Sequence, residues 1–409
     1  MAQRPFEVVV FGATGFTGQL VATYLARRYA GLRWAIAGRD RAKLAALRDQ
    51  LAEIDPALSE LSLLVADGSD AASVRELAEQ TVAIASTAGP FARHGSELVA
   101  ACVERGTHYC DITGEVQWVQ RMIHAHHRAA EAAGVRIVHC CGYDAVPSDL
   151  GVFALERHAR EAHGGPALDV LALSSRKAPG FSGGTYASAL MVVDEAIGDP
   201  AVRNVLADPF ALAPQPDAAE GNRREPRGPR YRAEAGVFTA PSINGPANAR
   251  VVHRTNGLLQ HAYGRAFSYE EVTPTGGGVL GALHAAAVSA GLASMSVGLL
   301  LPPARALARR LAPKPGEGPS EEARANSSFA LEFYGRVGDK KVRARFGAAG
   351  DPAYGETAKQ LAESVLCLAR DGATLPLHGG VLTPGAAMGA RLIERLRAAG
   401  TTVSAWTEA

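Results

Sequence analysis

The sequence predicts an α/β protein with an N-terminal doubly wound parallel sheet of the Rossmann type and a second α+β domain that carries a mixed sheet. Three observations support this fold class. Strand-like and helix-like segments alternate about six times in roughly the first 140 residues. A glycine-rich loop directly follows the first strand-like segment. The 409 residues, 47% hydrophobic and 20% charged, have an ordinary globular composition and exceed what one core usually covers.

The elements of the first domain follow from their apolar patterns. Short apolar runs predict parallel strands at 6–11, 34–37, 61–66, 82–87, 108–112 and 135–139. Apolar residues at helical spacing predict helices at 18–28, 43–51, 73–79, 97–105 and 119–133.

The alternation ends near Gly142–Pro147, and the pattern beyond it is different. Stronger polar alternation predicts strands of a mixed sheet at 168–174, 330–335 and 341–346, with helices at 354–368 and 384–399. We therefore expect three parts. These are a dinucleotide-binding domain (1–150), a substrate or dimerisation domain (151–350) and C-terminal helices (351–409) that pack back on the first domain.

The charge balance and the cysteines limit the partners. Lys and Arg number 42 against 41 Asp and Glu, so the net charge of +1 provides no chain-wide field for nucleic acid. Five cysteines without a signal peptide predict reduced thiols and a cytoplasmic location. No metal site is expected, because His124, His126 and His127 do not share one helix face and Cys140-Cys141 lacks a second pair.

The loop Gly12–Gly18 lies between the first strand and the first helix. A helix N-terminus free of side chains is the usual site of a dinucleotide pyrophosphate, whereas the alternative is a glycine-rich turn that binds nothing. The cofactor contacts expected within this loop are Gly12, Thr14, Gly15, Phe16, Thr17 and Gly18.

The end of the second strand predicts NADP rather than NAD. NAD enzymes place an acid here, but this chain has Gly38 followed by Arg39, with Lys43 close behind. Asp40 could face the ribose, although capping the next helix is the commoner use of such a residue. Asp67, after the third strand, is a further expected cofactor contact.

The loops after strands four and five should also face the ligand. Thr87, Gly89 and Pro90 are expected beside the nicotinamide ring, or else they form a simple turn. Asp111 and Glu115 place two carboxylates at the pocket edge, although Asp111 could equally cap the next helix.

These residues resemble the saccharopine dehydrogenase-like oxidoreductases, and within them the trans-acting enoyl reductases of phthiocerol-type lipid synthesis. The resemblance also includes Thr87–Phe91, Asp111–Glu115, Gly142–Leu150, Phe181–Thr185, Thr255-Asn256 and Gly380–Pro384. Tyr143 and Ala145 stand where members often carry Phe and Ser, and the charged substrate clamp of true saccharopine dehydrogenases has no clear equivalent.

The resemblance implies NADPH-dependent reduction of a carbon–carbon double bond in a long-chain acyl or polyketide lipid intermediate, in trans and carrier-bound. Two alternatives stay open: reduction of an imine or ketone metabolite, and a dinucleotide-binding scaffold without catalysis.

For enoyl reduction, the stretch Gly142–Asp149 offers the best catalytic residues. The acyl carbonyl needs a hydrogen-bond donor as enolate charge develops. Tyr143 is the first choice as that donor and Ser148 the second. Asp144 and Asp149 could orient the donor or cap a turn or helix. Lys177 and Ser182–Thr185 could line the pocket or form a glycine hairpin.

Two segments suggest partners. Residues 279–301 carry no formal charge and precede Arg305, Arg309, Arg310 and Lys314. They predict a helix on the inner, anionic membrane surface or a lid, with a buried or homodimer-interface helix and a true span as alternatives. The arginines at 223, 224, 227, 230 and 232 could dock an acidic carrier protein or form a solvated loop.

Overall fold

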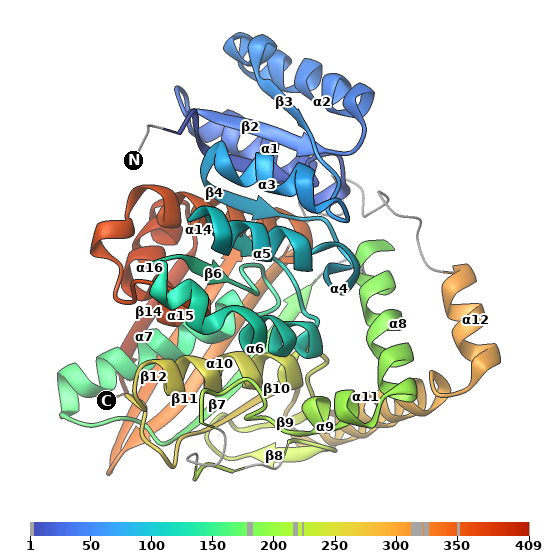
Figure 1. The fold of residues 1–409 in the computed structure, drawn as a ribbon. Helices are drawn as coiled ribbons and strands as arrows, with labels where there is room; N and C mark the ends of the chain where they lie inside the picture. The colour runs from blue at the N-terminus through green and yellow to red at the C-terminus, as the bar shows by residue number, and fades with distance from the viewer. Residues whose placement is uncertain are drawn as a thin grey trace.

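The computed structural model describes residues 4–177, 183–215, 220–222, 225–311, 322, 327–349 and 352–408. Two seven-stranded sheets organise these residues, one toward each end of the molecule (Figure 1). The first sheet is parallel and the second is mixed, so the predicted fold class is confirmed.

The first sheet has the strand order β13-β6-β5-β4-β1-β2-β3, and all its neighbours run parallel. Its strands are β1 (Phe6–Phe11), β2 (Trp34–Gly38), β3 (Ser62–Val65), β4 (Thr81–Ser86), β5 (His108–Asp111), β6 (Arg136–Val138) and β13 (Gly380–Leu382). The first six match the predicted strands. The seventh is a three-residue strand that arrives from the far end of the chain.

Helices cover both faces of this sheet. Those from the first part of the chain are α1 (Phe16–Arg28), α2 (Arg41–Ile54), α3 (Ala71–Glu79), α4 (Phe91–His94), α5 (Ser96–Arg105) and α6 (Val116–Ala132). One face also receives α14 (Thr357–Arg370), which packs on β1, β4 and β5. Leu361 and Val365 of α14 are fully buried in the same apolar cluster as Val8 and Val10 of β1.

The second sheet has the order β14-β12-β11-β7-β10-β9-β8, in which only β7 and β10 are parallel neighbours. Its strands are β7 (Asp169–Lys177), β8 (Arg230–Arg232), β9 (Val237–Pro241), β10 (Ser268–Gly276), β11 (Ser328–Val337), β12 (Lys340–Ala349) and β14 (Thr402–Thr407). The remaining helices are α7 (Val146–His163), α8 (Gly183–Gly198), α9 (Pro200–Ala207), α10 (Gly245–Leu258), α11 (Gly278–Gly298), α12 (Pro302–Leu311), α15 (Pro384–Ala387) and α16 (Gly389–Ala398).

The C-terminal part of the chain contributes to both sheets. Its helices include α14 on the first sheet, but Thr402–Thr407 pairs antiparallel with β12 of the second sheet. An all-helical C-terminal segment was therefore the wrong expectation for its last residues. The proposed division at residues 150 and 350 remains a proposal.

Helix α11 is the one described helix that is long and apolar enough to cross a membrane, with 11% of its most apolar window buried. Only Gly281, Ala285 and Ser289 are buried on it. The alternative of a buried core helix is therefore wrong for this chain as a monomer.

The arginine-rich segment is not one exposed loop. Arg232 lies in β8, is 7% exposed and pairs with Glu270 at 2.6 Å. Glu225 in the same segment pairs with buried Arg250 at 2.7 Å. Arg223 and Arg224 lie outside the described residues, as do Ser182 and Lys314.

Candidate functional site

The glycine loop is shaped by close contacts that only glycine permits. Gly12 has a φ of +79°, and a Cβ there would stand 2.9 Å from the backbone nitrogen of Ala88. A Cβ on Gly18 would lie 2.3 Å from the Gly12 carbonyl oxygen. The loop is thereby held against the β4 end, in the arrangement that a pyrophosphate site requires.

The N-terminus of α1 follows directly on the glycine loop. Gly15 precedes the helix, and no side chain caps it. Thr14, Gly15, Phe16 and Thr17 are only half-buried. The positive end of the helix dipole and uncapped N–H groups favour a phosphate there.

The residues after β2 present cations to the neighbouring space. Arg39 and Lys43 are exposed, whereas Asp40 accepts hydrogen bonds from the backbone nitrogens of Ala42 (3.0 Å) and Lys43 (3.1 Å). Asp40 therefore caps α2, which is the commoner of the two roles that the sequence allowed for it. Asp67 accepts from the Ser69 backbone nitrogen at 2.9 Å, which lowers the pKa of Asp67, with a smaller contribution from Arg39.

Arg39 should determine the preference for NADPH over NADH. Replacing Arg39 by Ala should weaken NADPH binding by about tenfold or more and change NADH binding little, because only NADPH has a 2′-phosphate for the guanidinium. Fluorescence titration with both dinucleotides measures this difference, and Arg41→Ala is the neighbouring control. Equal losses for both dinucleotides would contradict the assignment.

The loop after β4 lies against the glycine loop. The Thr87 hydroxyl donates to the carbonyl oxygens of Phe11 (3.2 Å) and Gly12 (3.0 Å). Gly89 is exposed and Pro90, after a cis peptide bond, is half-buried. Thr87 therefore supports the loop, while Gly89 and Pro90 line accessible space beside it.

Glu115 fixes the start of α4. Its carboxylate accepts from the backbone nitrogens of Phe91 (2.9 Å) and Ala92 (2.8 Å) and from the Ser188 hydroxyl (2.8 Å). Burial raises the pKa of Glu115, and these hydrogen bonds oppose the rise. The sequence predicted Glu115 only at the pocket edge, and in the structure its carboxylate caps the start of α4.

Asp111 is the centre of a buried network below this loop. It accepts from Thr113 (3.1 Å) and Cys140 (3.2 Å) backbone nitrogens, and His139 Nδ1 lies 2.7 Å from its other oxygen.

All five cysteines are buried. In the described part of the chain, no group of three His, Cys, Asp or Glu could hold a metal ion.

Tyr143 lies where the first domain meets the second sheet. Its ring packs edge-on against Phe329, with centroids 4.9 Å apart. Phe329 pairs in register with Arg176 of β7, and this pairing brings the Arg176 side chain near the Tyr143 ring. Burial raises the pKa of Tyr143, and the positive charge of Arg176 counteracts this. Arg176 was not predicted from the sequence as a site residue, although its neighbour Lys177 was.

The neighbours of Tyr143 differ in accessibility. Asp144 is exposed, and its carboxylate accepts from the Asn244 amide at 3.0 Å. Ser148 is 1% exposed, and its hydroxyl donates to Glu271 at 2.7 Å while accepting from Asn248 at 3.1 Å. Both predicted donors are therefore buried, Tyr143 at 5% exposure, and the Ser148 hydroxyl is held by Glu271 and Asn248.

Asp149 joins three of the motifs that carried the family resemblance. It is fully buried, and its carboxylate accepts from the Thr255 hydroxyl (2.5 Å) and the Gly385 backbone nitrogen (2.6 Å). Thr255 also lies 2.6 Å from Thr383. These residues connect α7, α10 and α15, which is a structural role.

A cavity of about 620 Å³ borders the Tyr143 region. It is lined by Ser175, Arg176, Ser328, Phe329, Ala330, Arg345, Gly347, Ala348, Ala349 and Thr402. Its walls combine small apolar residues with two guanidinium groups, so it can accept an apolar chain with an anionic group.

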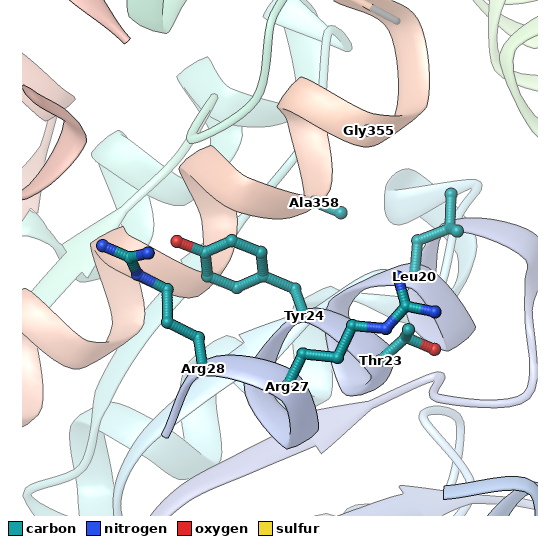
Figure 2. Close-up of a pocket in the computed structure, with 7 residues that line it drawn as sticks. All are labelled: Leu20, Thr23, Tyr24, Arg27, Arg28, Gly355 and Ala358. Atoms are coloured by element: carbon teal, nitrogen blue, oxygen red, sulfur yellow. The ribbon is translucent and has the colours of Figure 1, made fainter. Parts of the chain in front are cut away.

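A smaller hollow of about 370 Å³ lies between α1 and α14 (Figure 2). Its lining residues are Leu20, Thr23, Tyr24, Arg27, Arg28, Gly355 and Ala358. It shares no residue with the predicted site, and the Tyr24 hydroxyl beside it donates to Glu363 at 2.7 Å. The hollow is therefore separate from the predicted residues at Tyr143 and the glycine loop.

Comparison with known proteins gives the chain a family. A model of the saccharopine dehydrogenase NADP binding domain matches residues 8–138. A Mycobacterium tuberculosis protein, provisionally named a trans-acting enoyl reductase, is 41% identical over 98% of this chain and 97% of its own. The trans-acting enoyl reductase of Mycobacterium ulcerans is 38% identical over 99% of this chain and 98% of its own.

The fold has a solved counterpart. Apo saccharopine dehydrogenase (L-Glu forming) from Saccharomyces cerevisiae superimposes with a TM-score of 0.56 at 12% identity, over 98% of this chain and 99% of that one. This similarity concerns the fold alone. The match to the NADP-binding domain identifies NADP(H) as the cofactor, in agreement with the glycine loop and Arg39. With full-length relatives at this level of identity, the chain belongs to the trans-acting enoyl reductases of the saccharopine dehydrogenase-like family.

Proposed function

We propose that the protein is an NADPH-dependent oxidoreductase that reduces the carbon–carbon double bond of a long-chain acyl or polyketide intermediate in trans. One observation carries this proposal: relatives named trans-acting enoyl reductase match 98–99% of the chain, including both the glycine loop and the Tyr143 region. The glycine loop fits the cofactor, because its tight turn tolerates no Cβ at Gly12 or Gly18 and leads into a helix N-terminus without a side-chain cap.

The residues around the proposed site suit enoyl reduction. NADPH, when bound, supplies the hydride. Reduction of an enoyl thioester places negative charge on its carbonyl oxygen, where a positioned donor lowers the barrier. The Tyr143 phenol is protonated at neutral pH, as any tyrosine is, and burial raises its pKa further, so it can donate to that oxygen. Arg176 adds a positive charge beside it, while Asp144 is an exposed carboxylate that can orient polar groups of the substrate.

The partners follow from the same proposal. The substrate is a lipid or polyketide acyl chain carried by a separate protein, and the enzyme acts in the cytoplasm. The exposed helix α11 offers a surface either for a second copy of the chain or for the inner face of a membrane.

The proposed reaction predicts product formation from a thioester. With NADPH, the protein should convert a 2-enoyl pantetheine thioester to the saturated thioester, as measured by NADPH consumption and mass spectrometry. Imine and keto substrates serve as comparisons. Turnover of an imine or ketone alone would favour the metabolite reductase, and NADPH binding without turnover of any substrate would favour the scaffold.

Tyr143→Phe tests the donor. Loss of the phenolic hydroxyl should lower kcat by about 100-fold, because one oxyanion donor is removed, and leave the NADPH affinity within about twofold. Tyr231→Phe, on exposed β8, is the matched control. An unchanged kcat would assign the donor to another group.

A further inference from the structure

Three helices carry most of the large apolar side chains that the described chain exposes. These are α8, α11 and α12, which lie together at one side of the molecule (Figure 1). The exposed side chains on α11, α12 and the turn between them, which we call the apolar surface, are Val279, Leu280, Leu283, Met295, Val297, Leu300, Leu301, Leu307 and Leu311. Contiguous exposure on this scale is typical of an interaction site rather than of a free monomer surface.

Helix α11 is fastened along one side only. Gly281, Ala285 and Ser289 recur every four residues and are buried, and α11 packs on β9 and β10. The Thr275 hydroxyl donates to the Gly281 carbonyl oxygen at 2.9 Å. Because the helix is tied to the second sheet, its large side chains can meet a membrane from the side but the helix cannot cross it.

Helix α12 has two different faces. Arg305 and Arg309 both pair with Asp194 of α8, which ties this face to the protein. Leu307 and Leu311, 56% and 74% exposed, lie on the opposite face, with Arg310 at its border. An exposed apolar face beside a cation is the pattern of a helix that lies in a membrane interface.

The charge of this region distinguishes between partners. Residues 278–316 contain Arg305, Arg309, Arg310 and Lys314 and no Asp or Glu. Asp194 of α8, which pairs with Arg305 and Arg309, offsets one of these four charges, so the region stays basic. A two-fold contact between copies would bring the same basic segment toward itself. An anionic lipid surface would attract it instead.

We propose that the apolar surface of α11 and α12 binds an anionic phospholipid membrane peripherally, with the leucines in the interface and Arg310 at the lipid phosphates. This binding does not depend on the proposed reaction. A role of this surface in presenting acyl chains to the enzyme does rest on the proposed reaction. The surface is linked to the predicted site through α8, because the Ser188 hydroxyl donates to Glu115, and Glu115 accepts from the Phe91 backbone nitrogen just after Pro90.

Vesicle flotation tests the proposal on the full-length protein. Vesicles of phosphatidylcholine alone are compared with vesicles in which about one lipid in three is phosphatidylglycerol. The protein should float with the anionic vesicles at least about tenfold more than with the neutral ones. Arg310→Glu should weaken binding by about fivefold or more, since one interfacial cation contributes roughly this factor. Leu300→Ser/Leu307→Ser/Leu311→Ser should abolish flotation.

Matched controls are Arg336→Glu and Ile54→Ser, which change an exposed cation and an exposed apolar residue elsewhere. They should float like the unchanged protein, and circular dichroism verifies that each variant folds. NADPH consumption with a soluble short enoyl thioester should be the same for the triple variant, so failure of the proposed reaction is seen separately. No flotation, equal flotation of all variants, or a dimer in sedimentation that the triple variant loses without any vesicle binding would overturn the proposal.

Discussion

Gly18→Ala is expected to lower NADPH affinity by about 100-fold or more. The added Cβ would lie 2.3 Å from the Gly12 carbonyl oxygen and 2.8 Å from the Ala13 Cα, and both are backbone atoms that no side-chain rotation can clear. The loop must therefore move, and a displacement of about 1 Å at a positioned site can cost about 100-fold. Fluorescence titration with NADPH measures the change.

Two further variants make this result specific to the loop. Gly15→Ala brings its Cβ to 3.3 Å from the Gly12 carbonyl oxygen, a tight contact that small shifts relieve, so this variant should fold and bind NADPH more weakly. Gly228→Ala meets no atom within 4 Å and should change nothing. Full NADPH affinity in folded Gly18→Ala would show that the cofactor binds elsewhere.

Asp149→Leu is expected to lower the free energy of unfolding by about 1–3 kcal/mol. The substitution leaves the Gly385 N–H without its acceptor, and a buried polar group left alone costs about this much, whereas the Thr255 hydroxyl keeps Thr383 as a partner. Urea unfolding at constant pH measures the loss. A loss below about 1 kcal/mol would mean that water or a neighbour replaces the carboxylate.

The same residue should make stability depend on pH. Burial raises the pKa of Asp149 from 3.8 to about 7, so the folded protein holds this proton more tightly than the unfolded chain. The stabilisation is therefore complete below about pH 4 and is lost as the pH rises through 7. Asp149→Asn, which copies the protonated acid, should gain roughly 1 kcal/mol per pH unit relative to the unchanged protein between pH 4 and pH 7. A constant difference across this range would contradict the raised pKa.

Local patterns explain what the sequence could predict. The glycine loop and the Asp40 cap depend on residues within a few positions of each other, so both were correctly expected. The first six parallel strands are apolar runs bounded by glycines or helices. Strand β13 has three residues, too few for any periodicity to be recognised.

Long-range contacts explain why the roles of other residues could not be predicted from the sequence. Ser148 was a predicted donor, but its hydroxyl meets Glu271, a residue 123 positions away. Glu115 caps a helix that begins 24 positions before it. Nothing in either residue's neighbourhood along the chain shows these partners. Glu271 follows Glu270 in a strand that also contains Ser268, Thr273 and Thr275, so the sequence carries no signal that one of these carboxylates is buried in a polar network.

The late arrival of β13 and α14 has a consequence for synthesis on the ribosome. The first sheet lacks its edge strand and the helix that covers Val8 and Val10 until residues 357–382 have been translated. During that interval the nascent N-terminal domain exposes an apolar face and an unpaired β6 edge, which favours chaperone capture or aggregation. Co-translational folding of this domain therefore stays incomplete until almost the whole chain has left the exit tunnel.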